Sequence, residues 1–410
     1  MPDKRLKKLY DDTLLQDVIP FWEKHSPDRE FGGIFSSLGR RGELLDTDKS
    51  IWVQGRAGWM FSTLYHSLSK KEEWLEIARS CIHFLREHGE DESEKLYFTV
   101  TREGAPLRMR RYVFSEAFAS IANAAYFSIS DEERSRTDAL RFFESYILYS
   151  FQSGKIPAKS FRESKGLAPL MIAIVTAQEL RKHLGDQQIE GASFTEKING
   201  WIEEVYRDFF KEDEEALMEQ VGPAGEIQDH FDGRLLNPGH AIEAAWFILR
   251  EAYIQNDREK LKFGLRILDT MWQWGWDEKF GGILYFRDLK GLPVQEYWQD
   301  MKFWWPHNEA MIATLLAWKL TGDSVWRDRH ALVSDWSFKY FTDPEYGEWF
   351  GYLHRDGSPS VDLKGNMWKS PFHLPRALFT CLKILEIFPE EADVLPMEAS
   401  APLAERVQAL

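Results

Sequence analysis

Six helix-length segments that are apolar on almost every side recur along the 410 residues of this chain, and each begins with unusual polar residues. Comparable positions in these segments lie 55 to 72 residues apart, which accommodates a helix, a loop, a second helix and a longer loop. A helix that is apolar all round is buried, so the recurrence predicts six buried helices. Their starts read QGRAGWMF from Gln54, RRYVFSEAF from Arg110, GLAPLMIAI from Gly166, NPGHAIEAAWF from Asn237, WWPHNEAMIA from Trp304 and SPFHLPRALF from Ser370.

The segments between these buried helices have a different pattern. Charge-rich amphipathic helices are expected at 71–88, 133–151, 195–210 and 258–274, and no stretch alternates apolar and polar residues long enough for a large sheet. Buried helices that alternate with amphipathic ones predict an all-α (α/α)6 barrel of six inner and six outer helices. No linker divides the chain, so residues 1–389 are expected to form one catalytic domain, and residues 390–410 a peripheral tail.

Three loops share one turn pattern: DREFGG from Asp28, DEKFGG from Asp277 and DPEYGE from Asp343. A short β-favouring stretch follows each turn, so short β-hairpins are expected at the active-site end of the barrel. Lys49, Lys302 and Lys369 then each lie seven residues before a polar residue of an inner-helix start, namely Arg56, Glu309 and Arg376. We expect these lysines to occupy equivalent positions.

Charge and cysteine content restrict the partners and the compartment. The net charge of −15 argues against nucleic acid or an anionic membrane as partner. Cys81 and Cys381 cannot build a disulfide framework for a chain of this size, which favours a reducing compartment. The N-terminus has no apolar signal-like region and no run approaches 18 apolar residues, so a cytoplasmic protein is expected.

The polar residues at the inner-helix starts are candidates for chemistry, because burying them is costly unless they are paired or used. His240 and Glu243 are three residues apart and share a helical face, so the carboxylate is expected to orient the imidazole. His307 and Glu309 are two apart and should point in different directions. Charged groups that converge at one end of an apolar barrel are typical of a functional pocket.

Other chemistries fit the sequence less well. No H-x-x-x-H or C-x-x-C spacing indicates a metal site, and no phosphate-loop, G-x-S-x-G or dinucleotide motif is present. A glycosidase would need two carboxylates, for which Glu243 and Glu309 are candidates. Each of these glutamates has a histidine close by in the chain, however, and a two-carboxylate mechanism does not require one.

Several of these motifs together resemble the N-acylglucosamine 2-epimerase family, and the resemblance covers nearly the whole chain. It rests above all on WVQGRAGWM from Trp52, NPGH from Asn237, WWPHNEAMIA from Trp304, DPEYGEWFGYL from Asp343 and FHLPR from Phe372. The resemblance implies an (α/α)6 barrel, a homodimer, and interconversion of N-acetylglucosamine and N-acetylmannosamine at C2. It implies no cofactor for the chemistry itself. Some family members respond to ATP, so ATP as an effector stays open.

The resemblance also implies roles for individual residues. His240 and His373 correspond to the catalytic histidines, Arg56 to the group that stabilises the developing oxyanion, and Glu243 to the residue that orients His240. Cellobiose 2-epimerases carry a histidine motif on the third inner helix, where this chain reads Ala168-Pro-Leu-Met171, which favours a monosaccharide substrate. The residues expected to bind or surround the sugar are Glu309, Arg376, His307, Trp305, Met171, Tyr112 and Trp368.

Four alternatives remain at this point. The sugar could be free mannose or glucose, or the reaction an aldose–ketose isomerisation such as mannose to fructose. An (α/α)6 glycosidase and a non-enzymatic protease-binding protein are the remaining two.

Overall fold

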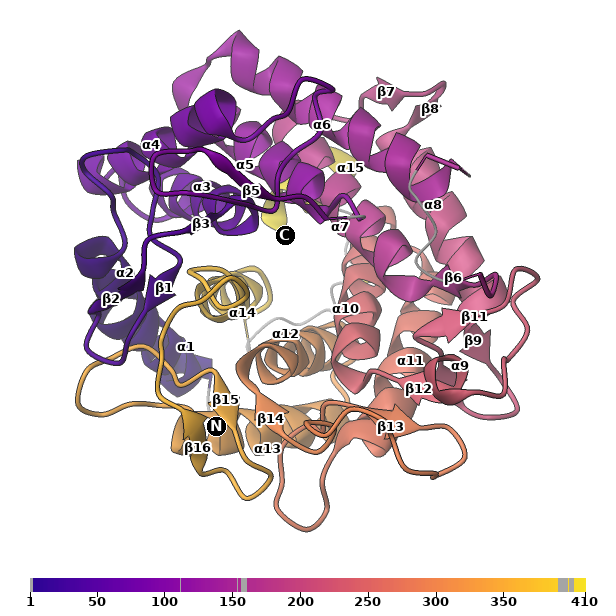
Figure 1. The fold of residues 1–410 in the computed structure, drawn as a ribbon. Coiled ribbons are helices and arrows are strands. Elements are labelled where there is room, and N and C mark those ends of the chain that lie inside the picture. Colours follow the sequence, from indigo (N-terminus) through magenta and orange to yellow (C-terminus); the bar gives the residue numbers. More distant parts are fainter. Residues whose placement is uncertain (1–2, 111, 153, 156–160, 390–396, 398–401) are drawn as a thin grey trace.

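The computed structural model describes residues 3–110, 112–152, 154–155, 161–389, 397 and 402–410. Its helices form two concentric rings, which confirms the predicted (α/α)6 barrel (Figure 1). The inner ring consists of α3 (Ile51–Ser67), α5 (Phe114–Ser130), α7 (Leu167–Leu184), α10 (Pro238–Gln255), α12 (Trp304–Thr321) and α14 (His373–Ile387). Each of these contains one of the six apolar segments recognised in the sequence.

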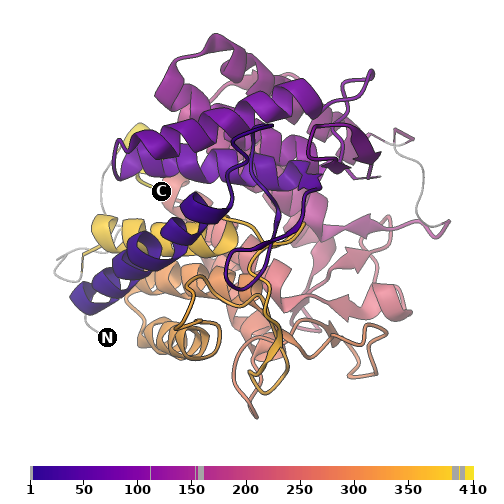
Figure 2. The same cartoon turned by 60° about the vertical axis from the view of Figure 1, so that its left-hand side comes forward.

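The outer ring is made of the amphipathic helices and of the N-terminus. Helix α1 packs against α14 and completes the outer ring (Figure 2). The Tyr10 hydroxyl, 2.7 Å from His330 Nε2, joins α1 to its outer neighbour. The outer helices are α4 (Glu72–His88), α6 (Glu133–Phe151), α8 (Phe194–Glu204), α11 (Arg258–Gly275) and α13 (Ser324–Tyr340), with α1 (Asp3–Asp12), the π-turn η1 (Thr13–Val18) and α2 (Ile19–His25) at the start of the chain.

The burial of the two kinds of helix follows the sequence pattern. Helix α12 is buried without a break from Trp304 to Ala317, whereas α11 buries only the residues on one side. The predicted bounds of the outer helices agree with the structure to within a residue or two, except at 195–210. There the α-helix ends and continues from Val205 as a short π-helix, η2 (Val205–Phe209).

The strands are two or three residues long, and several of them fix where inner helices begin. Strands β3, β6 and β14 directly precede α3, α7 and α12. The strands are β1 (Ser37–Leu38), β2 (Leu44–Asp46), β3 (Lys49–Ser50), β4 (Thr99–Val100), β5 (Pro106–Arg108), β6 (Lys165–Gly166), β7 (Gln188–Ile189), β8 (Ala192–Ser193), β9 (Phe210–Lys211), β10 (Ala216–Leu217), β11 (Gln220–Val221), β12 (Leu235–Leu236), β13 (Arg287–Asp288), β14 (Lys302–Phe303), β15 (Tyr352–Leu353) and β16 (Pro359–Val361).

Two of the three expected hairpins are present. Strand β1 pairs with β2, and β15 pairs with β16. The stretch after Asp277 differs, because β13 pairs with β12 just before α10. The buried ion pair of Arg234 and Asp288, 3.0 Å apart, ties these two strands together.

The recurring acidic turns are each closed by a buried lysine, although the third lysine is not the predicted one. Lys369 instead bonds Glu348 at 2.6 Å, because Glu348 stands where the other two turns have a glycine. The three closing pairs are Lys49 with Asp28 at 2.9 Å, Lys302 with Asp277 at 3.1 Å and Lys364 with Asp343 at 3.0 Å.

The end of the chain is described in part. Residues 390–396 and 398–401 of the expected tail lie outside the described residues. Residues Leu403–Ala409 form α15, which packs against α7 and α10, and the buried Arg406 donates to the Tyr253 carbonyl at 3.0 Å. A short helix, α9 (Phe231–Arg234), precedes β12. Among the described residues, no helix has the length and apolar character needed to cross a membrane.

Candidate active site

A cavity of about 600 Å³ lies inside the inner ring. At the end where the inner helices begin, its wall includes five of the residues singled out in the sequence, and they come from α3, α10 and α14. These five are Arg56, His240, Glu243, His373 and Arg376. The fold therefore brings together polar residues that are up to 320 positions apart in the chain.

His240 is held from two sides at the start of α10. Asn237 caps the helix, with its side-chain oxygen accepting the His240 N–H at 3.1 Å, and Pro238 occupies the first turn. The ring Nδ1 lies 2.9 and 3.0 Å from the two carboxylate oxygens of Glu219. Because an ionised carboxylate only accepts hydrogen bonds, Nδ1 carries a hydrogen, and Nε2 is the ring nitrogen left for the cavity.

Glu219 was not identified from the sequence. It lies between β10 and β11, and its carbonyl accepts the N–H of Leu167, the first residue of α7, at 3.0 Å. Strand β11, which directly follows Glu219, pairs with β6, which directly precedes α7, and Gln220 lies opposite Gly166. The start of α7 thus fixes the backbone of Glu219. Glu243, which was expected to orient His240, instead accepts from Arg376 at 2.8 Å.

His373 is held in a comparable way at the start of α14. Its Nδ1 lies 2.8 Å from Glu309 Oε1, so Nε2 again is the free ring nitrogen. Glu309 is fully buried and also accepts from Trp246 Nε1 at 2.8 Å and from Arg376 Nη2 at 2.5 Å. Glu309 therefore supports His373 from behind and does not form part of the cavity wall, whereas the sequence predicts that it contacts the sugar.

The two histidines have opposite tendencies to bind a proton. Burial disfavours the charged form of His240, but the carboxylates of Glu219, Glu243 and Glu309 outweigh it and raise its pKa. For His373, burial and the neighbouring guanidinium groups of Arg56 and Arg376 hold the pKa well below its usual value. The pKa shifts therefore favour the protonated form at His240 relative to His373, which is held as the neutral imidazole. Such divergent environments are typical of an acid and a base.

Arg56 presents a desolvated cation to the same region. Its Nη1 donates to the Trp368 carbonyl at 2.9 Å, and its guanidinium lies 4.3 Å from the Phe118 ring centre and 4.9 Å from that of Phe372. Burial and the charge of Arg376 lower its pKa to about 9, so it remains charged at neutral pH. The buried Nε has no partner among the described residues, which leaves donor capacity for a bound oxygen atom.

Glu243, Glu309 and His373 bring potential metal-ligand atoms within 4.8 Å of one another. Arg376 Nη2, however, bonds the carboxylates of both Glu243 and Glu309. The guanidinium thus already supplies the positive charge between these carboxylates, and the donor set fits a metal ion poorly.

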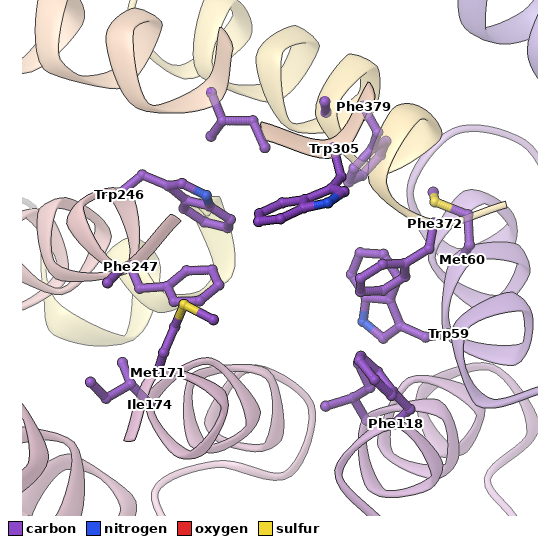
Figure 3. Packing of buried hydrophobic residues seen from close by; sticks show 14 of the residues in the cluster. Trp59, Met60, Phe118, Met171, Ile174, Trp246, Phe247, Trp305, Phe372 and Phe379 are labelled. Carbon is purple, nitrogen blue, oxygen red and sulfur yellow. The ribbon is translucent and has the colours of Figure 1, made fainter. Parts of the chain in front are cut away.

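Aromatic and apolar side chains complete the wall. The Trp305 ring lies 5.1 Å from the His240 ring and 5.9 Å from the His373 ring, so it packs against both histidines. Figure 3 shows Trp305 of α12 and Met171 of α7 bordering the central space. The remaining predicted wall residues, Tyr112 and Trp368, also line the cavity and are partly exposed.

His307 lies outside the cavity wall, whereas the sequence predicts that it binds the sugar. Its Nε2 accepts the N–H of Ile283 at 2.8 Å, and its Nδ1 lies 2.7 Å from the Phe303 carbonyl. Two other inner helices use a side chain in the same way: Gln54 Oε1 accepts from Ile34 at 2.8 Å and Glu116 Oε1 from Leu96 at 3.0 Å. His307 thus anchors a loop to the start of α12.

Comparison with known proteins identifies the family of the chain. The family model for N-acylglucosamine 2-epimerase (GlcNAc 2-epimerase) matches residues 33–376. An N-acylglucosamine 2-epimerase from Bos taurus is 35% identical over 384 residues, which covers 90% of this chain and 89% of that protein.

Solved structures of related sugar enzymes share the fold. The cellobiose 2-epimerase of Bacillus thermoamylovorans B4167 has a TM-score of 0.81 at 22% identity, with 93% of this chain and 99% of that chain covered. A D-mannose isomerase has a TM-score of 0.78 at 17% identity, with 92% and 97% covered. The fold, the family model and the bovine relative together show that this chain belongs to the N-acylglucosamine 2-epimerase family of carbohydrate epimerases and isomerases.

Proposed function

We propose that the protein interconverts N-acetyl-D-glucosamine and N-acetyl-D-mannosamine by moving the C2 proton between His240 and His373. The observation that supports this most strongly is geometric: two histidines line the cavity, and a carboxylate holds the Nδ1 of each, so that both Nε2 atoms are left for the substrate; their pKa values are shifted in opposite directions. Inversion at C2 requires removal of a proton from one face and delivery to the other. One neutral and one protonated imidazole supply these two functions.

The reaction starts from the open-chain sugar, because the C2 proton becomes acidic only beside the C1 aldehyde. Neutral His373 Nε2 takes this proton, and the electron pair moves onto the aldehyde oxygen to give an enolate. Arg56 donates to that oxygen, as preorganised donors do at developing oxyanions. Protonated His240 then delivers its Nε2 proton to C2 from the opposite face. The reverse reaction exchanges the roles of the two histidines.

The carboxylates behind the histidines keep Nε2 reactive in both. Glu219 and Glu309 each hold an Nδ1–H, which fixes the tautomer and the ring orientation. Arg376 neutralises Glu309, so this carboxylate orients His373 without raising its pKa as Glu219 does for His240. The same kind of contact thus gives a base on one side and an acid on the other.

The N-acetylated sugar is favoured over a free hexose by the relatives and by the wall of the cavity. The bovine relative named for N-acylglucosamine is 35% identical, whereas the cellobiose 2-epimerase of Bacteroides fragilis is 24% identical over 407 residues. Phe118, Met171 and Trp246 form an apolar part of the wall that can contact an acyl methyl group. A homodimer and a cytoplasmic location stay predictions from the sequence.

Proton NMR in deuterated water tests this function. The enzyme is incubated separately with N-acetylmannosamine, N-acetylglucosamine, mannose and cellobiose, with and without ATP. We expect epimerisation of the N-acetylated pair with deuterium incorporated at C2, and much slower turnover of mannose and cellobiose. Formation of fructose from mannose at a higher rate would show an aldose–ketose isomerase instead. A requirement for ATP would assign it an effector role.

A further inference from the structure

The cavity continues past the catalytic residues toward the other end of the barrel. Its wall includes residues that lie about two helical turns further along three inner helices: Thr63 on α3, Glu179 on α7 and Arg250 on α10. Arg250 follows Glu243 by seven residues, which places it roughly 10 Å deeper along the helix axis. The cavity thus has two polar layers, and the deeper one takes no part in the proposed reaction.

An apolar girdle separates the two layers. Trp59, Val175, Trp246 and Phe379 lie three or four residues beyond the catalytic layer on their helices and line the cavity. Figure 3 shows Trp59 and Trp246 facing the central space from opposite sides. Trp246 Nε1 donates upward to Glu309 at 2.8 Å, whereas Trp59 Nε1 donates to Glu179 of the deeper layer at 2.9 Å.

Arg250 carries hydrogen-bonding capacity that the described residues do not use. It is 4% exposed, and only its Nη1 is bonded, to Glu179 at 2.7 Å. Its Nε and Nη2 are buried without a partner among the described residues, as is the hydroxyl of Thr63. A buried donor left unsatisfied costs about 1–3 kcal/mol, so three of them in one compartment indicate a group that accepts hydrogen bonds.

The charges of the deeper layer favour an anion as that group. Arg250 and Lys182 are cations, whereas Glu179 is the carboxylate on this part of the wall. His183 also lines the compartment, but burial lowers its pKa to about 3, so it is neutral. Among the side chains on this part of the wall, two cations therefore stand against one carboxylate, an excess of one positive charge.

We propose that this deeper compartment, lined by Thr63, Glu179, Lys182 and Arg250, is a second binding site that takes a small oxyanion of the sulfate or phosphate kind. Three donor groups and an excess positive charge match tetrahedral oxygens better than they match a neutral sugar. The site is independent of the proposed epimerase reaction, since none of its four residues contacts the catalytic histidines in the described structure.

Isothermal titration calorimetry of the full-length protein with sodium sulfate tests the proposal, at constant ionic strength maintained with chloride. Sulfate keeps the same charge between pH 6 and 9. We expect saturable binding of one sulfate per chain. Arg250→Gln and Lys182→Met should each weaken binding at least tenfold, and Thr63→Val should weaken it less. Burial lowers the pKa of Lys182 to about 8, so binding should be weaker at pH 9 than at pH 7.

Two control variants distinguish this site from surface charge and from the catalytic layer. Lys383→Met removes a cation from the same end of the barrel but outside the cavity wall, and should change sulfate affinity less than twofold. Arg56→Gln should also leave it unchanged. If Arg250→Gln does not fold, Lys182→Met and Thr63→Val carry the test. Absence of saturable binding, equal weakening by Lys383→Met, or loss of binding in Arg56→Gln would each overturn the proposal.

Discussion

Replacing Glu219 by Gln should lower the pKa of His240 without disrupting the active-site fold. Glu219 is the carboxylate nearest to the His240 ring and contributes most to raising its pKa. The amide oxygen of Gln can still accept the Nδ1–H, but the charge is lost. A hydrogen bond to a charged group contributes about 1.5–3 kcal/mol, against about 0.5–1.5 kcal/mol for a neutral one. The difference between the middles of these ranges, roughly 1.3 kcal/mol, corresponds to about one pKa unit.

We therefore expect the pKa of His240, measured by NMR of 13C-labelled histidine, to fall by about one unit in Glu219→Gln. The rate in the direction that needs protonated His240 should fall by up to about tenfold at pH 7.5 and recover partly at pH 6, where more of the imidazole is protonated. Glu203→Gln, which removes the same charge from the exposed side of α8, serves as control and should behave as wild type. An unchanged pKa in Glu219→Gln, or equal effects of the two variants, would refute the positioning role.

Three further predictions follow from other parts of the structure. His240→Asn and His373→Asn should each lower the rate of net epimerisation by at least about 10²-fold. Each variant should still exchange the C2 proton of one epimer for deuterium, and proton NMR should find that the two variants label opposite epimers. Burial raises the pKa of Glu116 to about 7, so the wild-type protein loses stability as the pH rises from 4.5 through 7. Glu116→Gln should therefore raise the melting temperature at pH 8 but hardly at pH 5. Gln54→Glu, which introduces a buried carboxyl group, should lower the melting temperature at pH 8 but hardly at pH 5. Lys369→Met leaves the Glu348 carboxylate buried without this partner and should destabilise by about 3–5 kcal/mol in denaturant unfolding, against under about 1 kcal/mol for the half-exposed pair broken in Lys383→Met.

The barrel could be predicted from the sequence because burial leaves a direct trace in composition. Helix α12 is apolar on every side because it has neighbours on every side. The same apolar pattern recurs six times along the chain, which predicts a ring of buried helices. The same trace located His240, His373 and Arg56, because polar residues stand out at the start of such helices. Residues at comparable positions of a repeat point toward one axis, so their convergence could be predicted as well.

Glu219 could not be found in this way. It lies on neither an inner nor an outer helix, and its position depends on the pairing of two-residue strands that have no sequence signature of their own. The nearer carboxylate in the chain, Glu243, has helical spacing to His240 and was therefore the expected partner. In the structure, Glu243 instead accepts a hydrogen bond from the guanidinium of Arg376, which comes from another inner helix, α14. Helical spacing predicts which residues share a face but not which ion pairs form between helices.

His307 illustrates a different limit of sequence-based prediction: a residue type that is common in active sites here bonds only backbone groups. Its spacing from Glu309 predicted correctly that the two would point apart, but not which of them would face the histidines. Comparison with Gln54 and Glu116 explains the position of His307. The side chains of Gln54, Glu116 and His307 each accept a backbone N–H from the loop beside their helix. A glutamine, a glutamate and a histidine can replace one another there, since the loop requires only an acceptor at that point. His240 and His373 differ from His307 in that both line the cavity, and this difference, rather than the residue type, supports their proposed role.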